Sequence, residues 1–407
     1  MDIDDLLDWR KMETTDIIKR LENETSDYLV KQKILYTWDL LVQKKDYSNT
    51  ACQCQVILDK TWEHLNTGYW KDVKLVWRHV YSFAALMKTF SLFKLGDIQA
   101  ALKACDMGLL MGAPIFDNIL STLASKLSSL KKSDEKDAYQ NISTVDNDEP
   151  VYKKTKSNTG EGVENKMEST FMIERVDSPS LIKFQEKYLH HQKPVIITNC
   201  MDFWPAMSSH RWSIKYMQNV AGLRTVPVEI GDKYTSDTWT QTLMTVNDFI
   251  EKYIINKTQT GYLAQHQLFD QIPELKRDIF VPDYCYLSEI EDDNAPVLMN
   301  AWFGPKGTVS PLHHDPYQNL LAQVMGSKYI RLYNRDSSFM YVNSGSILDN
   351  TSQVDMENID FDEFPRFHEN TYCECILNEG EMLFIPFKWW HFVKSLSTSF
   401  SVSFWWK

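Results

Sequence analysis

Cysteine is scarce in this sequence, and long apolar runs are missing. The 407 residues include seven cysteines, an odd number scattered along the chain. This excludes a dense disulfide framework and favours a reducing compartment. The first residues, "MDIDDLLDWR", are acidic and lack the pattern of a secretory leader. No apolar stretch approaches the ~18 residues that a membrane-spanning helix needs, so we expect no membrane segment.

The sequence also lacks an excess of basic residues. It has 43 lysines and arginines against 55 aspartates and glutamates, a formal net charge of −12. Such a chain is poorly suited to capturing nucleic acid phosphates, so we expect no direct nucleic-acid binding. Basic protein partners fit this charge better. Hydrophobic residues make up 43% of the chain and aromatic residues 13%, which predicts a packed globular core.

The chain divides into three parts. Residues 1–130 are expected to form an all-α region, because apolar side chains recur every three or four positions over 75–114. The segment "GDIQAALKACDMGLLM" is typical of one repeat helix, but no second copy follows at a fixed period, so we expect no repeat array. This region would pack on the rest of the chain or dock a protein partner. Residues 131–167 are polar and predict a flexible linker, in which "KKTK" is a short charged run.

Residues 168–407 have the composition of a β domain. Short segments rich in β-branched and aromatic residues follow one another, among them "KPVIITNC", "RTVPVEIG", "GEMLFIPF" and "SFSVSFWW". In the last of these, Phe400, Val402 and Phe404 share one face and the intervening serines share the other. "WSIKYMQNVA" and "VNDFIEKYI" predict helices outside the sheets. The expected fold class is α+β: a barrel or jelly roll with surrounding helices, preceded by the helical region.

A group of metal-binding side chains lies inside this β domain. In "SPLHHDPYQN", His313 and Asp315 would point the same way from one strand end, while His314 would point away. With 10 histidines and 55 carboxylates, chance alone yields roughly 1.4 His-x-Asp/Glu motifs, so the motif by itself is weak. Its position between apolar strands adds weight, and His391 in "FKWWHFV" supplies a third ligand. Two histidines and one carboxylate form the facial triad of non-haem iron(II) oxygenases.

Lys328 is a second candidate for a functional residue. In "SKYIRLY" it shares a strand face with Ile330 and Leu332, which is the more apolar face. A buried lysine requires a negative partner. The distal carboxylate of 2-oxoglutarate, the cosubstrate of many such oxygenases, would be that partner. The alternative is that this face points outward and Lys328 is solvated.

The segments "AWFGPKGTVSPLHHDPYQNLLAQVMGSKYIRLY", "NTSQVD" and "GEMLFIPFKWWHFVKSLSTSFSVSFWW" resemble the JmjC oxygenases. The resemblance extends over about residues 168–407, and it implies a double-stranded β-helix that uses Fe(II), 2-oxoglutarate and O₂. His314 departs from the glutamine expected in the vertebrate pattern. By this resemblance, the metal ligands and catalytic residues are His313, Asp315 and His391; the 2-oxoglutarate site has Tyr262, Ser310, Asn319 and Lys328; and the substrate pocket has Glu229, Gln265 and Trp302.

The resemblance implies more than one reaction. Relatives are associated with C3 hydroxylation of arginine residues, with lysine demethylation and with clipping of histone tails at methylated residues. Glu229 favours arginine, because a carboxylate can pair with a guanidinium in a fork. Its alternative is an ordinary half-exposed strand position. A non-catalytic chromatin-binding protein is the alternative of another class.

Three further expectations complete this interpretation of the sequence. Substrates would be basic proteins or peptides that contain arginine, with chromatin-linked or ribosomal proteins and histone tails as candidates. The expected location is the nucleus, with the cytoplasm as a further compartment. Two Cys-x-Cys pairs, at 52–54 and 373–375, lack a matching set of ligands at the spacing of a structural zinc site, so we expect them to be packing residues.

Overall fold

The computed structural model describes most of the chain. The expected linker lies largely outside the described residues, and so does its "KKTK" run. The described positions are 27–68, 72–139, 170–231, 239–287, 295–343 and 348–407, together with Ile3, Thr235 and Gly345.

The N-terminal region is helical, as expected. Three of its helices begin at an aspartate: Asp27, Asp46 and Asp97 each accept a hydrogen bond from the backbone N–H three residues later. The last helix continues to Tyr139, so residues 131–139, which we expected to belong to the linker, are helical. The described helices are α3 (Tyr28–Asp39), followed by the π-helical turn η1 (Leu40–Lys44), α4 (Tyr47–Leu65), α5 (Leu75–Lys94), α6 (Ile98–Met111) and α7 (Ile119–Tyr139).

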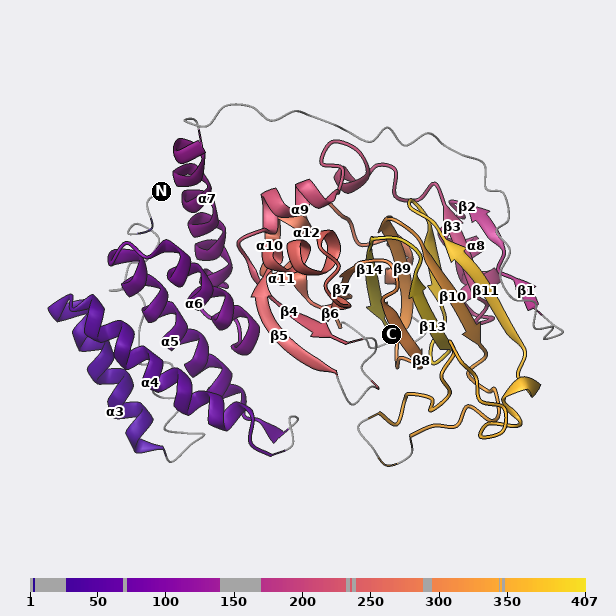
Figure 1. Cartoon of the computed structure of the whole chain (residues 1–407), viewed down its shortest axis with the longest axis horizontal. Helices are drawn as coiled ribbons and strands as arrows, with labels where there is room; N and C mark the ends of the chain where they lie inside the picture. Colours follow the sequence, from indigo (N-terminus) through magenta and orange to yellow (C-terminus); the bar gives the residue numbers. More distant parts are fainter. Residues whose placement is uncertain are drawn as a thin grey trace.

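The C-terminal region contains two facing sheets, which confirms the expected barrel-like fold (Figure 1). The five-stranded sheet has the order β1-β11-β10-β13-β8, and the nine-stranded sheet has the order β2-β3-β12-β9-β14-β7-β6-β4-β5. The strands are β1 (Thr170–Met172), β2 (Arg175–Asp177), β3 (Val195–Thr198), β4 (Thr225–Ile230), β5 (Thr240–Thr245), β6 (Gly261–His266), β7 (Leu298–Gly304), β8 (Val309–His313), β9 (Gln318–Met325), β10 (Lys328–Tyr333), β11 (Tyr372–Leu377), β12 (Met382–Ile385), β13 (Trp390–Ser395) and β14 (Ser399–Trp406).

Short helices cover the outer face of the larger sheet, and the two helices predicted from the sequence are among them. Trp212, just before α9, packs edge-on against Phe400, and Trp204 packs in the same way against Phe404. The described helices here are α8 (Leu181–Phe184), η3 (Gln185–Leu189), η4 (Pro205–Met207), α9 (Ile214–Ala221), α10 (Val246–Phe249), η5 (Ile250–Ile255), α11 (Leu268–Gln271), α12 (Pro273–Lys276), η6 (Asp283–Tyr286) and η7 (Phe367–Glu369).

The two faces of β14 divide the apolar core from a polar interior. Phe400, Val402 and Phe404 belong to the core between the nine-stranded sheet and its helices. The serines at the alternate positions are fully buried as well, and Ser403 lines a cavity between the two sheets. Both faces of β14 are thus buried: its apolar side chains face the helices outside the sheet, and its serine hydroxyls face the space between the two sheets. The alternation in "SFSVSFWW" therefore predicts where a polar site can form.

A glycine turn carries the chain from one sheet to the other. The predicted break at 325–327 separates β9 from β10, and these strands lie in different sheets. Gly326 has φ 74°, and a Cβ there would lie 2.2 Å from the carbonyl oxygen of Thr398. Only glycine fits this turn, which brings Lys328 onto the sheet that also carries His313 and His391.

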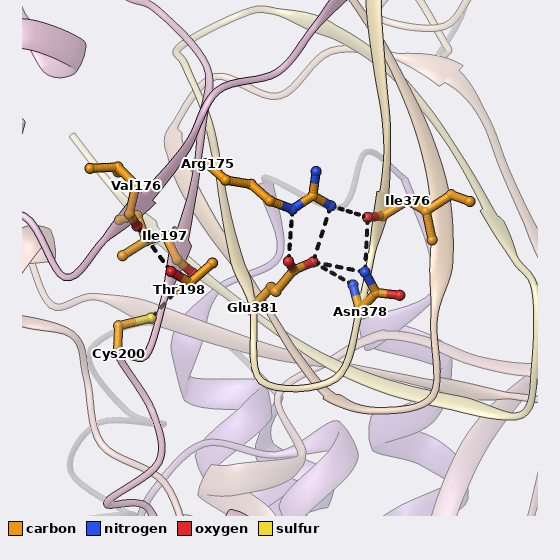
Figure 2. Close-up of polar contacts among 8 residues, drawn as sticks. All are labelled: Arg175, Val176, Ile197, Thr198, Cys200, Ile376, Asn378 and Glu381. Atoms are coloured by element: carbon orange, nitrogen blue, oxygen red, sulfur yellow. Dashed lines mark hydrogen bonds and ion pairs between the residues drawn. The ribbon is translucent and has the colours of Figure 1, made fainter. Parts of the chain in front are cut away.

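A surface ion pair joins the two sheets (Figure 2). Arg175 on β2 donates from Nε to Oε1 of Glu381 at 2.8 Å and from Nη2 to the carbonyl of Ile376 on β11 at 2.8 Å. The backbone N–H of Asn378 donates to Oε2 of the same glutamate. Arg175 thus connects a strand of the larger sheet to a strand of the smaller one through one planar guanidinium.

A buried polar cluster fixes the helical region against the larger sheet. Asp106 on α6 accepts from Nε and Nη2 of Arg224 at 2.9 and 2.7 Å, and both side chains are about 1% exposed or less. It also accepts from the backbone N–H of Thr225, the first residue of β4, and from Nε2 of Gln271 on α11. Figure 1 shows α6 beside β4 and β5. Both oxygens of this carboxylate accept hydrogen bonds across the interface, so the cluster fixes the position of the helical region relative to the larger sheet.

The cysteines pack as expected. All seven cysteines are free, and Cys54 and Cys375 lie in apolar cores, consistent with packing residues. Within the described residues, no helix combines the length and apolarity needed to cross a membrane.

Candidate active site

Three metal-binding side chains converge between the sheets. His313 ends β8, and His391 is its register partner on the adjacent strand β13. Asp315 follows β8 in the loop, and its Oδ2 lies 3.9 Å from Nε2 of His313 and 3.5 Å from Nε2 of His391. Among the described residues, this is the group of histidine, cysteine and carboxylate side chains that could hold a metal ion.

Backbone carbonyls orient both imidazoles. Nδ1 of His313 donates to the carbonyl of Pro311 at 2.7 Å, and Nδ1 of His391 donates to the carbonyl of Trp389 at 3.0 Å. A carbonyl can only accept, so Nδ1 carries the proton and the lone pair of Nε2 points toward Asp315. Burial, reinforced by the charge of His391, lowers the pKa of His313 to about 4. This imidazole is therefore neutral near pH 7, which is the form that binds metals.

The donor set fits ferrous iron. Two imidazole nitrogens and one carboxylate oxygen face the same point, and these ligand atoms all lie within 4.8 Å of one another. Converging lone pairs repel one another unless a cation lies between them. A set of two histidines and one carboxylate that leaves other positions open is the ligand pattern of non-haem iron(II) oxygenases. His314 is outside the group, as predicted: its ring packs edge-on against Trp390 at 4.6 Å.

The four residues assigned to 2-oxoglutarate line the same cavity as the triad. Tyr262 comes from β6, Ser310 from β8, Asn319 from β9 and Lys328 from β10. All four are buried. The cavity is thus built from both sheets, and the strand alternation that predicted an inward-facing Lys328 is correct.

The amine of Lys328 is buried, and the described residues around it offer no anionic partner. It is 1% exposed, and its Nζ donates to the hydroxyl of Tyr262 at 3.2 Å. Among the described residues, no carboxylate forms an ion pair with it. Burial lowers the pKa of this lysine to about 7. Oδ1 of Asn319 is also buried and has no hydrogen-bond partner. A cosubstrate with a distal carboxylate would pair with the Lys328 ammonium group, so the pocket fits 2-oxoglutarate.

Trp302 forms part of the wall of this cavity. Its Nε1 donates to Oγ of Ser403 at 3.0 Å, and its ring lies 6.2 Å from that of Tyr262, centroid to centroid. The sequence did not single out the other wall residues, although strand alternation would have placed each of them inside. They are Leu321, Ile385 and Val393; Ser403 belongs to the serine face of β14, which the sequence did identify.

Glu229 and Gln265 differ in their relation to this cavity. Glu229 on β4 is the register partner of Tyr262, and it is half-buried. Burial raises the pKa of its carboxyl, and a hydrogen bond with Trp239 opposes this in part. Gln265 is exposed and borders a different cleft. The pairing of β6 with β7 shifts between Leu263 and His266, and Gln265 has φ 45°, so strand alternation from Tyr262 does not hold there.

Comparison with known proteins agrees with this geometry. Residues 182–407 match the family described as "Cupin-like domain", and residues 41–141 match "KDM8-like, N-terminal ARM repeats". The chain is 47% identical to "Lysine-specific demethylase 8" of Danio rerio over 94% of both chains. It is 44% identical to the Xenopus tropicalis protein of the same name, over 88% of this chain and 90% of that protein.

The chain belongs to the lysine-specific demethylase 8 family of JmjC proteins. A further relative, "Jumonji C domain-containing protein 5" of Drosophila melanogaster, is 36% identical over 86% of this chain and 85% of that protein. The JmjC cupin-like domain is an Fe(II)- and 2-oxoglutarate-dependent oxygenase fold, and the His-Asp-His triad is present here.

One expectation about the helical region was wrong. The family match describes residues 41–141 as ARM repeats, whereas we expected no repeat array. In such arrays the packing of successive helix pairs repeats, and each pair contacts only its neighbours. Here α4 packs on α5, α5 on α6 and α6 on α7. Packing of this kind requires apolar positions and not identical residues, so a search for a repeated sequence misses it.

Proposed function

We propose that this oxygenase hydroxylates arginine residues of protein substrates at C3. His313, Asp315 and His391 would hold the iron, and Lys328 with Tyr262, Ser310 and Asn319 would hold 2-oxoglutarate. Bound together, the metal and cosubstrate supply the oxidant: O₂ and 2-oxoglutarate become succinate, CO₂ and one oxygen atom inserted into a C–H bond of the substrate. The chain's own residues orient the reactants and exclude water.

Glu229 is the observation that carries the choice of arginine. It is a half-buried carboxylate beside Tyr262, and burial raises its pKa. Among the described residues, no cationic side chain forms an ion pair with it. A guanidinium is permanently charged and can donate two parallel hydrogen bonds to one carboxylate. Such a fork would fix the arginine side chain with one methylene toward the metal.

Lysine demethylation is the second candidate. The relatives from Danio rerio and Xenopus tropicalis are named lysine-specific demethylases. The rings of Tyr262 and Trp302, 6.2 Å apart, offer π faces on which a methylammonium group can pack. The same oxygen insertion, directed at an N-methyl group, would release formaldehyde. The product therefore separates the two candidates.

Glu229→Gln tests the arginine proposal. The amide keeps the shape, removes the charge and halves the acceptor capacity. Loss of a charge-assisted pair in a shielded pocket costs about 2–5 kcal/mol, so arginine hydroxylation should fall at least about 30-fold. Succinate release without peptide does not use Glu229 and should continue. Glu251→Gln, at an exposed position on η5, is the matched control.

Two results would contradict the proposal. One is hydroxylation of an arginine peptide by Glu229→Gln at the wild-type rate. The other is a wild-type enzyme that releases formaldehyde from methyl-lysine peptides and leaves arginine peptides unchanged.

The proposed partners are basic proteins, including histone tails, and the proposed location is the nucleus. The charge of −12 and the names of the relatives support both. Imaging of the tagged full chain should show a nuclear signal, and a signal confined to the cytoplasm would contradict this. The helical region is the proposed docking surface for a further protein.

A further inference from the structure

A second cavity lies between the helical region and the larger sheet. It has a volume of about 530 Å³. One wall is the C-terminal end of α6 with the connection to α7, and the other is formed by β4, β5 and the end of β6. Its walls include Met111, Pro114 and Asn118 on the helical side and Gln241, Leu243 and Gln265 on the sheet side. We call this cavity the interdomain cleft.

The interdomain cleft shares a sheet face with Glu229. On β4 and β5, Glu229 is opposite Gln241 and Pro227 is opposite Leu243. Directly opposite residues project from the same face of a sheet, and so do alternate residues of one strand. Glu229 is also opposite Tyr262 on β6, and Tyr262 lines the cavity of the triad. One sheet face therefore runs from Tyr262 at the triad cavity, past Glu229, to the cleft.

The walls of the cleft are fixed relative to each other. Asp106 near the end of α6 binds Arg224 and the backbone of Thr225, where β4 begins. Gln271 joins the same cluster and also donates to the carbonyl of Thr225 at 2.7 Å. Because these groups are buried and form hydrogen bonds with one another, they hold the two walls of the cleft at a fixed separation.

The chemistry of the cleft suits an extended polypeptide. Leu243 is 40% exposed and offers apolar contact, as do Met111 and Pro114 opposite it. The amide side chains of Gln241 and Gln265 both donate and accept, as peptide groups require. Among the described residues, β5 pairs only with β4, so its outer edge presents backbone groups that an extended chain can pair with.

We infer that the interdomain cleft binds the segment of the protein substrate next to the target residue. This inference rests on the proposed function. The substrate's reactive side chain would enter beside Glu229, and its flanking residues would follow the shared face of β4 and β5 into the cleft. The helical region thus supplies one wall of the substrate site, in addition to any partner that it docks.

Peptide length tests the inference in the full chain. A peptide with about three residues on each side of the target arginine spans ~10 Å per side and reports on the catalytic pocket. One with about twelve residues per side can reach the cleft. We expect kcat/KM to be about tenfold higher for the long peptide, mainly through a lower KM.

Pro114→Arg should abolish the advantage of the long peptide, because Pro114 is an exposed cleft position and a long cationic side chain would fill the space. The short peptide should react as before. Thr122→Arg is the matched control, since it is exposed on α7 outside the cleft walls, and it should keep the length dependence. Leu243→Arg repeats the test from the opposite wall if Pro114→Arg folds poorly. Equal kcat/KM for both peptides, or a length dependence that survives both cleft variants, would overturn the inference.

Photo-crosslinking separates failure of the inference from failure of the proposed function. A long peptide carrying benzoylphenylalanine in its flanks should label residues 109–118 or 240–245. If neither peptide gains oxygen on arginine, the proposed function fails, while the labelled positions still decide whether the cleft holds the peptide. Labels confined to other surfaces would refute the cleft, and crosslinks between two copies of the chain would identify a second copy as its occupant.

Discussion

Replacing Lys328 by methionine should stabilise the fold in the absence of 2-oxoglutarate while abolishing binding of this cosubstrate. The lysine is 1% exposed, and its one described polar contact is the 3.2 Å hydrogen bond to Tyr262. Methionine fills a similar volume and has no charge to bury. Without its anionic ligand, the pocket therefore contains a functional group that costs stability.

The magnitude follows from the pKa of Lys328. A fall from 10.5 to about 7 corresponds to about 5 kcal/mol against the charged form. The variant also loses the hydrogen bond to Tyr262 and leaves that hydroxyl without its partner, which reduces the gain in stability by about 1–3 kcal/mol. The net gain at pH 7 should be about 2–4 kcal/mol. Between pH 7 and 10.5 the unfolded chain binds more protons at this site than the folded one, so wild-type stability rises with pH and the gain shrinks.

Urea unfolding at pH 7 and pH 10, with and without 2-oxoglutarate and a redox-inert divalent metal, measures both effects. Lys328→Met should unfold at higher urea than wild type at pH 7, with a smaller difference at pH 10. It should show no stabilisation by 2-oxoglutarate. Lys252→Met, at an exposed position on η5, should change stability by less than about 0.5 kcal/mol. A variant destabilised at pH 7, or still stabilised by 2-oxoglutarate, would refute the reasoning.

Three further predictions follow from the described contacts. Asp315→Ala should abolish iron binding in a metal titration and all succinate release, while far-ultraviolet circular dichroism remains unchanged; near-normal turnover would contradict the triad. The affinity for 2-oxoglutarate, measured by calorimetry, should fall by up to about tenfold per pH unit above pH 7, because Lys328 loses its proton there. An affinity that does not change between pH 7 and pH 9 would count against this. Asp106→Ala should lower stability by about 3–5 kcal/mol, because Arg224 is left buried without its partner, whereas Asp270→Ala on an exposed position of α11 should have little effect; equal urea midpoints would contradict this.

The sequence predicted the catalytic cavity well because strand alternation is a local rule. His313, Asp315 and Lys328 could be placed on inward faces from their immediate neighbours, and His391 followed from the need for a third ligand. The serine face of β14 could be identified in the same way. Each of these side chains lies on or just after a strand, where a period of two residues predicts its direction. The pairing of β8 with β13 shifts between Ser310 and His313, so alternation from His313 does not place Ser310.

Reasoning from local patterns was limited where the strand or the repeat is irregular. Gln265 follows a shift in the pairing of β6 with β7 and has a positive φ, so strand alternation could not place it. The ARM repeats preserve helix packing and not residue identity, so no period is visible in the sequence. The length of α7 was underestimated because its last two turns are polar, and polar residues are common in linkers as well as in helices.

The interface between the two regions could not be predicted from sequence at all. Asp106 and Arg224 are 118 positions apart, and each looks like an ordinary charged residue among its neighbours. Only the fold brings them together and removes both from water. The interdomain cleft depends on this contact, and it is likewise visible only in three dimensions.

The central claim is that the triad, 2-oxoglutarate and O₂ together insert oxygen into arginine. Its most direct test is mass spectrometry of an arginine-containing basic peptide, incubated with the full chain, Fe(II), ascorbate and 2-oxoglutarate under ¹⁸O₂. The account predicts one ¹⁸O atom on the arginine side chain, with labelled succinate formed in at least an equal amount and no product from Asp315→Ala. Unmodified arginine alongside formaldehyde release from a methyl-lysine peptide, or oxygen incorporation without 2-oxoglutarate, would contradict it.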